Sequence, residues 1–295
     1  MTMIIDAHHH IWRRADLPWL EGPMQPRIFG PYEPIRRDYP IEEYLADIAG
    51  SNVARSVYVQ ANWRKEAFEE EVRYVQSVAD ETGFPQGITG YADFLAEDVR
   101  PQLDRLTPYR SMRGLRMQLH WHENSQYRFA AAPDLARDAT LRRNVNRLAD
   151  YGWLFELQVF AEQMQGAAEL AASAPSVTFI LQHAGMLEDV SAEGWARWRT
   201  GMQRLATCPN VMTKLSGLGT FLHRNDAAHI AAVLRDTIGM FGPSRCLFGS
   251  NFPIEKLWTS YEDLVAAYRT ALEPVGNEVA RAVLHDNAAR IYKLS

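Results

Sequence analysis

Three features of the sequence predict a single (β/α)8 barrel. Eight short apolar runs with the length of β-strands alternate with longer amphipathic segments that have the pattern of helices. The length of 295 residues is near the ~250 residues typical of such barrels. No linker, repeat or low-complexity segment interrupts the alternation, so residues 1–295 are expected to form one domain. A doubly wound sheet is the alternative, but it would carry a glycine-rich phosphate turn after an early strand, and the sequence has none.

The elements of the first half follow from this alternation in chain order. The first expected strand is 3–10, and the long segment 13–40 follows it. The amphipathic pattern of 41–50 (IEEYLADIAG) then leads to the β-branched run VARSVYVQ. The expected strands of this half are 3–10, 53–60, 86–92 and 113–119, and the expected helices are 41–50, 64–82 and 97–107.

The second half continues the same pattern. Short runs such as LFELQV and VTFILQH are rich in Val, Ile, Leu and Phe, as buried parallel strands are. The expected strands are 154–159, 177–183, 211–216 and 246–251. The expected helices are 140–151, 162–173, 195–206, 226–240, 260–272 and 277–291, the last two closing the chain.

The segment 13–40 is unusually long for a connection inside a compact domain. It contains six prolines together with Trp19, Phe29 and Tyr32. Connections of more than ~15 residues in a compact domain are usually functional. Because it leaves the end of the first strand, we interpret it as a lid over that end, with Trp19 in contact with substrate. The alternative is an extension that packs on the outside of the barrel.

The first strand carries two candidate catalytic residues. Side chains of a strand alternate between its faces, so Asp6, His8 and His10 are expected on one face and His9 on the other. Imidazoles two residues apart can bind a metal ion, polarise a carbonyl or move protons, and Asp6 could orient one of them. The alternative, a surface histidine cluster or a tag remnant, fits poorly with a strand pattern.

Other polar residues close the later strands, where barrel enzymes carry their chemistry. His183 follows an apolar run and precedes Ala184-Gly185, which favours a catalytic role. Arg116 and Lys214 could receive a carboxylate or an oxyanion, although Lys214 could equally form a structural ion pair. Further candidates are Gln158 and Asn251 at strand ends and His122, which lies past the fourth strand in a loop.

Composition restricts the class of partner. The net charge is −5 and the pI is near 6.0, without a basic stripe, which argues against nucleic acid and anionic membranes. No apolar run reaches ~18 residues, and Cys208 and Cys246 have no metal or redox spacing. A small-molecule substrate and a cytoplasmic location are expected, and a homo-oligomer is compatible with the sequence.

Several motifs resemble the amidohydrolase superfamily, in its branch of sugar and aromatic-pathway lactonases. That branch includes 2-pyrone-4,6-dicarboxylate lactonase and L-rhamnono- and L-fuconolactonases. The matching stretches are DAHHHIW (6–12), RGLR (113–116), FELQV (155–159), LQHAG (181–185), NVMTKLSGL (210–218), FGPSRCLFGSNFP (241–253) and NAARIY (287–292).

The resemblance implies hydrolysis of a cyclic ester and matches His8, His10 and His183 to the family's histidines. The superfamily's metal-bridging Lys and its further His are replaced by Arg116 and Gln158, so a binuclear metal centre is not expected. Asn251 stands where the family commonly has Asp, which leaves the general base open.

The sequence therefore predicts a lactonase in which His8, His10 and His183 polarise the ester carbonyl, directly or through one Zn²⁺. Three protein ligands suffice for a single zinc ion, and metal-free operation fits equally well. Base catalysis is assigned to an imidazole titrating near ~6.5 or to a metal-bound water near ~7. The alternatives are a metal-dependent decarboxylase of a carboxylated aromatic or muconate, and a non-catalytic ligand-binding paralogue.

Overall fold

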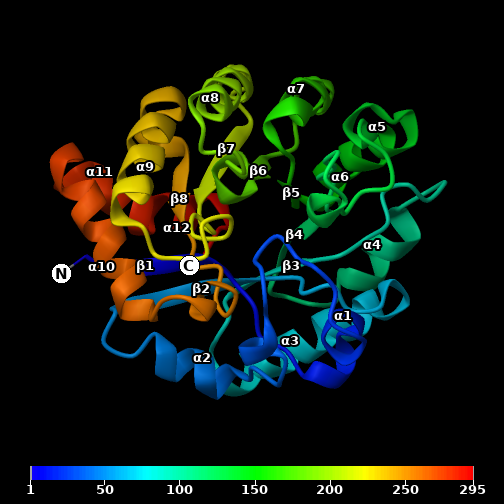
Figure 1. Ribbon diagram of the computed structural model, residues 1–295. Helices are drawn as coiled ribbons and strands as arrows, with labels where there is room; N and C mark the ends of the chain where they lie inside the picture. The colour runs from blue at the N-terminus through cyan, green and yellow to red at the C-terminus, as the bar shows by residue number, and fades with distance from the viewer. Residues whose placement is uncertain (1, 295) are drawn as a thin grey trace.

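The computed structural model describes residues 2–294, and they form an eight-stranded barrel of parallel strands surrounded by helices (Figure 1). The strands follow one another around the barrel in sequence order, which confirms the predicted (β/α)8 fold. They are β1 (Ile4–His9), β2 (Val53–Val59), β3 (Gly87–Gly90), β4 (Met112–Arg116), β5 (Leu154–Leu157), β6 (Phe179–Leu181), β7 (Val211–Leu215) and β8 (Cys246–Phe248).

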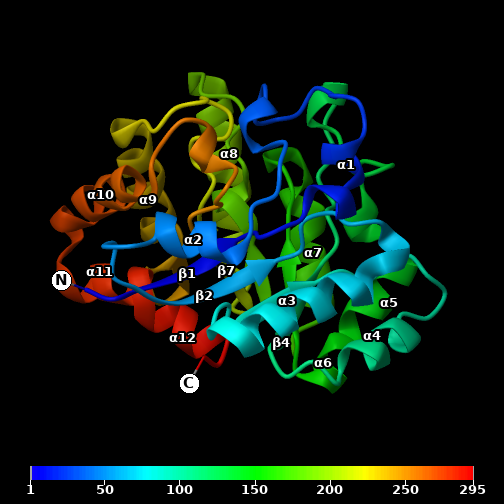
Figure 2. The ribbon, with the colours of Figure 1, turned by 90° about the horizontal axis from the view of Figure 1, so that it is seen from below.

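The helices cover the outside of the strands (Figures 1 and 2). Two predicted helices, 140–151 and 277–291, are each broken into two short helices, the second pair joined by a π-helical turn at Ala282–Asp286. The helices are α1 (Pro18–Glu21), α2 (Ile41–Asp47), α3 (Phe68–Thr82), α4 (Arg100–Leu106), α5 (Ala139–Asn146), α6 (Leu148–Tyr151), α7 (Met164–Ser173), α8 (Ala192–Ala206), α9 (Ala227–Phe241), α10 (Tyr261–Leu272), α11 (Asn277–Arg281) and α12 (Asn287–Ile291). None of those in residues 2–294 combines the length and apolarity needed to cross a bilayer.

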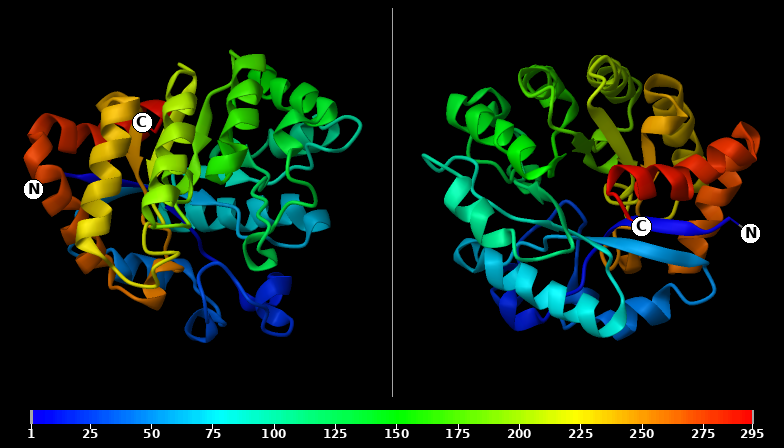
Figure 3. Two further views of the ribbon diagram at one scale, coloured as in Figure 1. Left: turned by 45° about the horizontal axis from the view of Figure 1, so that its top comes forward. Right: turned by 180° about the vertical axis from the view of Figure 1, so that it is seen from behind.

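The apolar core has two parts. The larger part lies between the strands and the helices, and a smaller cluster fills the barrel interior with Ile5, Val57, Leu154, Ile180 and Leu247. Ala288 and Tyr292, from α12 and the residue after it, join this inner cluster. The C-terminal segment thus closes one end of the barrel (Figure 3) and leaves the opposite end for a site.

The seam between the first and the last strand is joined by a buried carboxylate. Asp6 accepts five hydrogen bonds: from the backbone N–H groups of His8 and Ser250, and from the hydroxyls of Ser250, Tyr44 and Tyr261. The backbone N–H of Asn251 also donates to the carbonyl of His8 at 2.7 Å. These contacts attach β1 to the segment that follows β8.

The strands end earlier than predicted, so several site residues lie in the turns just beyond them. β6 ends at Leu181, and His183 to Met186 all have positive φ angles, between 46° and 72°. Asn251, after β8, has a φ of 58°. Left-handed backbone in residues other than glycine is strained and tends to gather at functional sites.

The segment 13–40 lies over the open end of the barrel. Figure 2 shows the part that carries α1 on the side of the strands opposite to α12. Trp19 donates from Nε1 to the carbonyl of Ala61 at 2.9 Å, and the carbonyls of Arg27 and Ile28 contact Gln126 and His223 from the loops after β4 and β7. The lid interpretation is therefore supported, and the extension packed on the outside of the barrel is not.

Candidate active site

A cavity of about 90 Å³ lies beneath this segment at the open end of the barrel. It brings together six of the predicted site residues, which come from five different strand ends and the lid. These lining residues are His10, Trp19, Arg116, Gln158, His183 and Asn251.

The alternation of side chains along β1 is interrupted at its histidines. The pairing of β1 with β2 shifts register between Asp6 and His9, so Ala7 joins the barrel interior and His8 contacts the interior histidines. The prediction that Asp6 shares a face with His8 is wrong, because the extra residue turns Asp6 toward the outer helices. His9 also faces outward, as predicted: its ring stacks on Tyr44 at 3.9 Å.

His8 lies just below the cavity and is fully buried. Its ring centroid is 5.1 Å from that of His10 and 4.7 Å from that of His183. Neither of its ring nitrogens has a hydrogen-bond partner. A buried polar atom without a partner is costly in a structural role, so His8 fits a site that receives a ligand or water.

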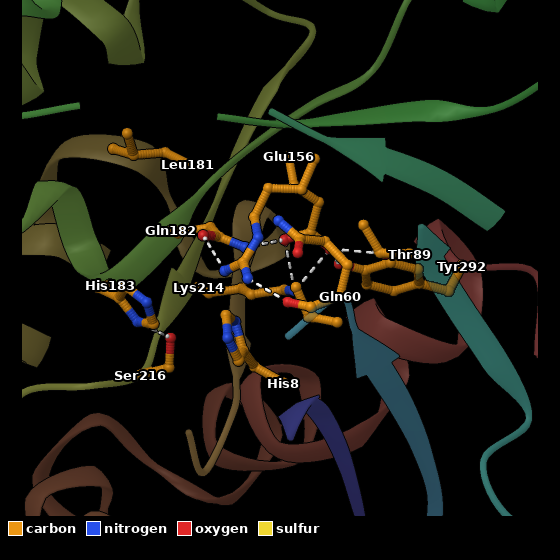
Figure 4. A network of polar contacts seen from close by, with 12 residues as sticks. His8, Gln60, Thr89, Glu156, Leu181, Gln182, His183, Lys214, Ser216 and Tyr292 are labelled. Atoms are coloured by element: carbon orange, nitrogen blue, oxygen red, sulfur yellow. Dashed lines mark hydrogen bonds and ion pairs between the residues drawn. The ribbon is translucent and has the colours of Figure 1, made fainter. Parts of the chain in front are cut away.

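The hydrogen bond of His10 fixes its tautomer. Nδ1 lies 2.7 Å from the carbonyl oxygen of Val59, which can only accept. Nδ1 therefore carries the proton, and neutral His10 presents an unshared electron pair at Nε2. His183 contacts the hydroxyl of Ser216 through Nδ1 at 2.9 Å (Figure 4), a partner that can donate or accept.

All three interior imidazoles are held neutral. Burial, together with the positive charges of Arg116 and Lys214, lowers the pKa of His183 to about 3, and the pKa values of His8 and His10 fall well below the usual range. The expected titration of an imidazole near ~6.5 is therefore not supported. Neutral imidazole is the form that accepts a proton or binds a metal.

Arg116 presents a fixed positive charge to the cavity. Its guanidinium donates to the side-chain oxygen of Gln182 at 3.1 Å and to the carbonyl of Gln60, while its Nε has no partner. Burial lowers the pKa of Arg116 only to about 10, so it stays charged at neutral pH.

Lys214 does not line this cavity, which corrects its assignment as a substrate contact. Its ammonium lies 2.7 Å from both carboxylate oxygens of Glu156, and both side chains are fully buried in the barrel (Figure 4). Gln182, Thr89 and Tyr292 also donate to Glu156. Of the two roles that the sequence left open for Lys214, the structure shows the structural ion pair. Gln182 donates to Glu156 and accepts from Arg116, so it connects this ion pair to Arg116.

His122 is also absent from the cavity wall. It lies in the loop after β4, where its ring contacts Tyr127 and Phe160 and its Nδ1 accepts from the backbone N–H of Asn124. His122 therefore packs on aromatic side chains and not against the cavity. Gln158, by contrast, lines the cavity and leaves its side-chain oxygen buried without a partner.

Glu255 is a residue whose environment the sequence did not predict. It is buried behind Asn251 and Thr220, two lining residues, and accepts from Thr220 at 3.2 Å and from Trp258 at 2.9 Å. Burial raises its pKa to about 7, against the opposing effect of these hydrogen bonds and of one to Asn251. A carboxyl group that titrates near neutral pH therefore contacts the wall of the site.

Comparison with known proteins agrees with this geometry. A family model described as amidohydrolase matches residues 5–294. The chain belongs to the amidohydrolase family. This amidohydrolase is 35% identical over 293 residues to the uncharacterized protein y4mH of Sinorhizobium fredii, covering 99% of this chain and 98% of the relative.

Two further relatives come from Burkholderia multivorans. One is an L-fucono-1,5-lactonase, 29% identical, with 98% of this chain and 96% of the relative covered. The other is an amidohydrolase solved with zinc bound, 27% identical, with a TM-score of 0.82 and coverage of 99% and 100%. The resemblance predicted from the motifs is confirmed at the level of the family.

The residues of this amidohydrolase meet only part of the requirement for a metal ion. His8 and His10 offer unpartnered nitrogens in neutral rings. Within residues 2–294, however, no three His, Cys, Asp or Glu side chains are grouped so as to hold an ion, and Arg116 and Lys214 place positive charge beside the imidazoles. The donor set, as these residues are arranged, is therefore not a ready metal site.

Proposed function

We propose that this amidohydrolase hydrolyses a lactone, the cyclic ester of a sugar acid or of an aromatic-pathway acid. The observation that carries the proposal is that a neutral His10, with its Nε2 electron pair free, and a charged Arg116 line the same cavity. One side chain can accept a proton while the other stabilises a negative charge. The fucono-lactonase relative supports the choice of an ester.

In the proposed reaction, water attacks the ester carbonyl while Nε2 of His10 takes its proton. The carbonyl oxygen becomes an oxyanion that accepts hydrogen bonds from Arg116, whose guanidinium has five N–H groups and donates to Gln182 and to the carbonyl of Gln60 through two of them. The ring C–O bond then breaks, and the proton moves from His10 to the leaving oxygen. The product is an open hydroxy acid.

The low pKa of His10 suits the second half of this reaction. A depressed pKa makes the neutral ring a weak base, but it makes the transient imidazolium a strong acid that readily protonates an alkoxide. Asn251 and Gln158 line the same space and can orient water and substrate through hydrogen bonds.

A panel of aldonolactones and pyrone lactones, read by acid release, tests the proposal. We expect turnover of at least one lactone, lost in His10→Ala and retained in His9→Ala. Release of carbon dioxide from an aromatic acid without any lactone hydrolysis would identify a decarboxylase instead. Ligand-induced stabilisation with no turnover across the panel would identify a binding protein.

The role of a metal is tested separately on the purified protein. If the side chains act alone, activity survives chelation and does not depend on the metal content. Activity that is lost on chelation and restored by Zn²⁺ would show that His8, His10 and His183 rearrange into a zinc site, the alternative that the sequence predicted.

A further inference from the structure

A second, larger cavity adjoins the first. Its volume is about 420 Å³, against about 90 Å³ for the cavity of the candidate site. The two share four lining residues: Trp19, Arg27, Asn62 and Gln118. The other walls come from the segments that follow β2, β3 and β4, so the second cavity opens from the same end of the barrel.

Three cations without an ion-pair partner in residues 2–294 line this second cavity. Arg27, Arg64 and Lys65 line it, and none of them lies within ion-pair distance of a carboxylate in the described part of the chain. The acidic lining residue, Glu71, uses one oxygen to accept from Tyr58 and from the backbone of Ala61. The charge of the lining therefore favours an anion.

The wall of the second cavity contains several aromatic side chains, and it carries polar atoms without hydrogen-bond partners. Nε1 of Trp63, the hydroxyl of Tyr91 and the side-chain oxygen of Gln118 are all buried atoms that make no hydrogen bond. Trp63 is itself 7% exposed. Two of these atoms can donate, as the cations do, so the wall is rich in unused donors that a carboxylate would satisfy.

We propose that the second cavity is a subsite for a carboxylated ring attached to the lactone. The ring would pack against the aromatic wall while its carboxylate meets Arg64, Lys65 and Trp63. The lactone itself would lie beyond Trp19 and Arg27 in the smaller cavity. This inference rests on the proposed lactonase function, and it predicts a substrate of two rings in which the one that is not hydrolysed is acidic.

Binding of the isolated acidic ring tests the subsite independently of turnover. Glucuronate and benzoate represent a sugar acid and an aromatic acid, and titration of the whole protein with each is followed by calorimetry. We expect saturable binding of one of the two, weakened about tenfold in the double variant Arg64→Ser, Lys65→Ser, and weakened several-fold in Trp63→Phe. Arg73→Ser, which removes an exposed cation of α3 that does not line the cavity, is the matched control.

Three outcomes separate the two proposals. Binding that the double variant weakens and Arg73→Ser does not supports the subsite, and so does a preference for a lactone linked to the same acidic ring over its uncharged analogue. Failure of both acids to bind, or equal weakening in the control, overturns the subsite. Binding with the expected variant pattern but no hydrolysis of any lactone supports the subsite and contradicts the proposed function.

Discussion

His9 and His10 are neighbours in the sequence with opposite environments. His9 is fully buried against Tyr44 and hydrogen-bonded to Ser56, whereas His10 lines the cavity. His183, on the far side of the barrel, also lines it. Substitution of His9 should therefore affect mainly stability, whereas substitution of His10 or His183 should affect mainly activity.

We expect His183→Ala to lower kcat/KM by about 100-fold or more, because it removes a side chain from the reacting space. His9→Ala should lower kcat/KM by less than about tenfold. It should instead reduce the free energy of unfolding by about 2–4 kcal/mol, because it leaves a hole beside Tyr44. Steady-state kinetics and denaturant unfolding measure the two effects. Equal losses of activity would mean that the assigned faces of β1 are wrong.

Glu255 should control the pH dependence near neutrality. Its pKa is raised to about 7, so its carboxylate forms as the pH rises through that value. Since the carboxylate holds Asn251 at the wall of the cavity, kcat/KM should rise with pH and level off above about 7. The imidazole of His183, with a pKa near 3, remains neutral throughout this range.

The variant Glu255→Gln should remove that ascending limb and lower kcat/KM by about tenfold. Glu71→Gln is the matched control for the limb, because Glu71 is also buried with a pKa raised to about 7 but contacts Tyr58 rather than Asn251. Since Glu71 lines the second cavity, only the position of the limb is compared between the two variants. A limb near 7 that survives in Glu255→Gln would assign it to another group, such as a metal-bound water.

At the scale of elements, the lid consists of a buried base and a partly buried tip. Leu17, Leu20 and Tyr32 belong to the main apolar core, whereas Arg27 to Phe29 at the tip line the cavity. The base should therefore be needed for folding and the tip for binding.

Replacing residues 23–30 by a short Gly-Ser link should raise KM about tenfold and change kcat less, with the fold intact. Phe29→Ala is a milder variant of the same change. Removal of the whole segment 13–40 should unfold the protein, because it strips side chains from the core. Circular dichroism and KM measurements distinguish these results, and an unchanged KM in the tip variant would contradict the lid.

The sequence was sufficient for the elements but not for their finer register. Alternating apolar runs predicted eight strands and located His10, Arg116, Gln158, His183 and Asn251 at one end of the barrel. The sequence could not reveal the register shift in β1, because an alternation with a strict period of two assumes that the strand contains no extra residue. Nor could it show the depth of Lys214 or the burial of Glu255, because both depend on side chains distant in sequence, such as Glu156 and Thr220.

At the scale of the whole molecule, the C-terminal segment is part of the barrel interior. Tyr292 donates to Glu156 at 2.6 Å and closes the end opposite the site. Tyr292→Phe keeps the ring but removes this donor, so we expect a loss of about 1–2 kcal/mol in unfolding free energy with kcat/KM nearly unchanged. Chemical denaturation and kinetics check both. A large loss of activity would show that the network also positions Arg116 through Gln182.

The buried Asp6 has a consequence for the order of events during synthesis. Its partners Ser250 and Tyr261 lie 244 and 255 residues further along the chain. At roughly 5–20 residues per second, the ribosome makes Ser250 about 12–50 s after Asp6. Until then the first strand has no last strand to join, and its carboxylate lacks most of its donors. The barrel therefore cannot close before this last segment has been made, and the candidate site is assembled only after nearly all of the residues from Asp6 to Tyr261 have been synthesised.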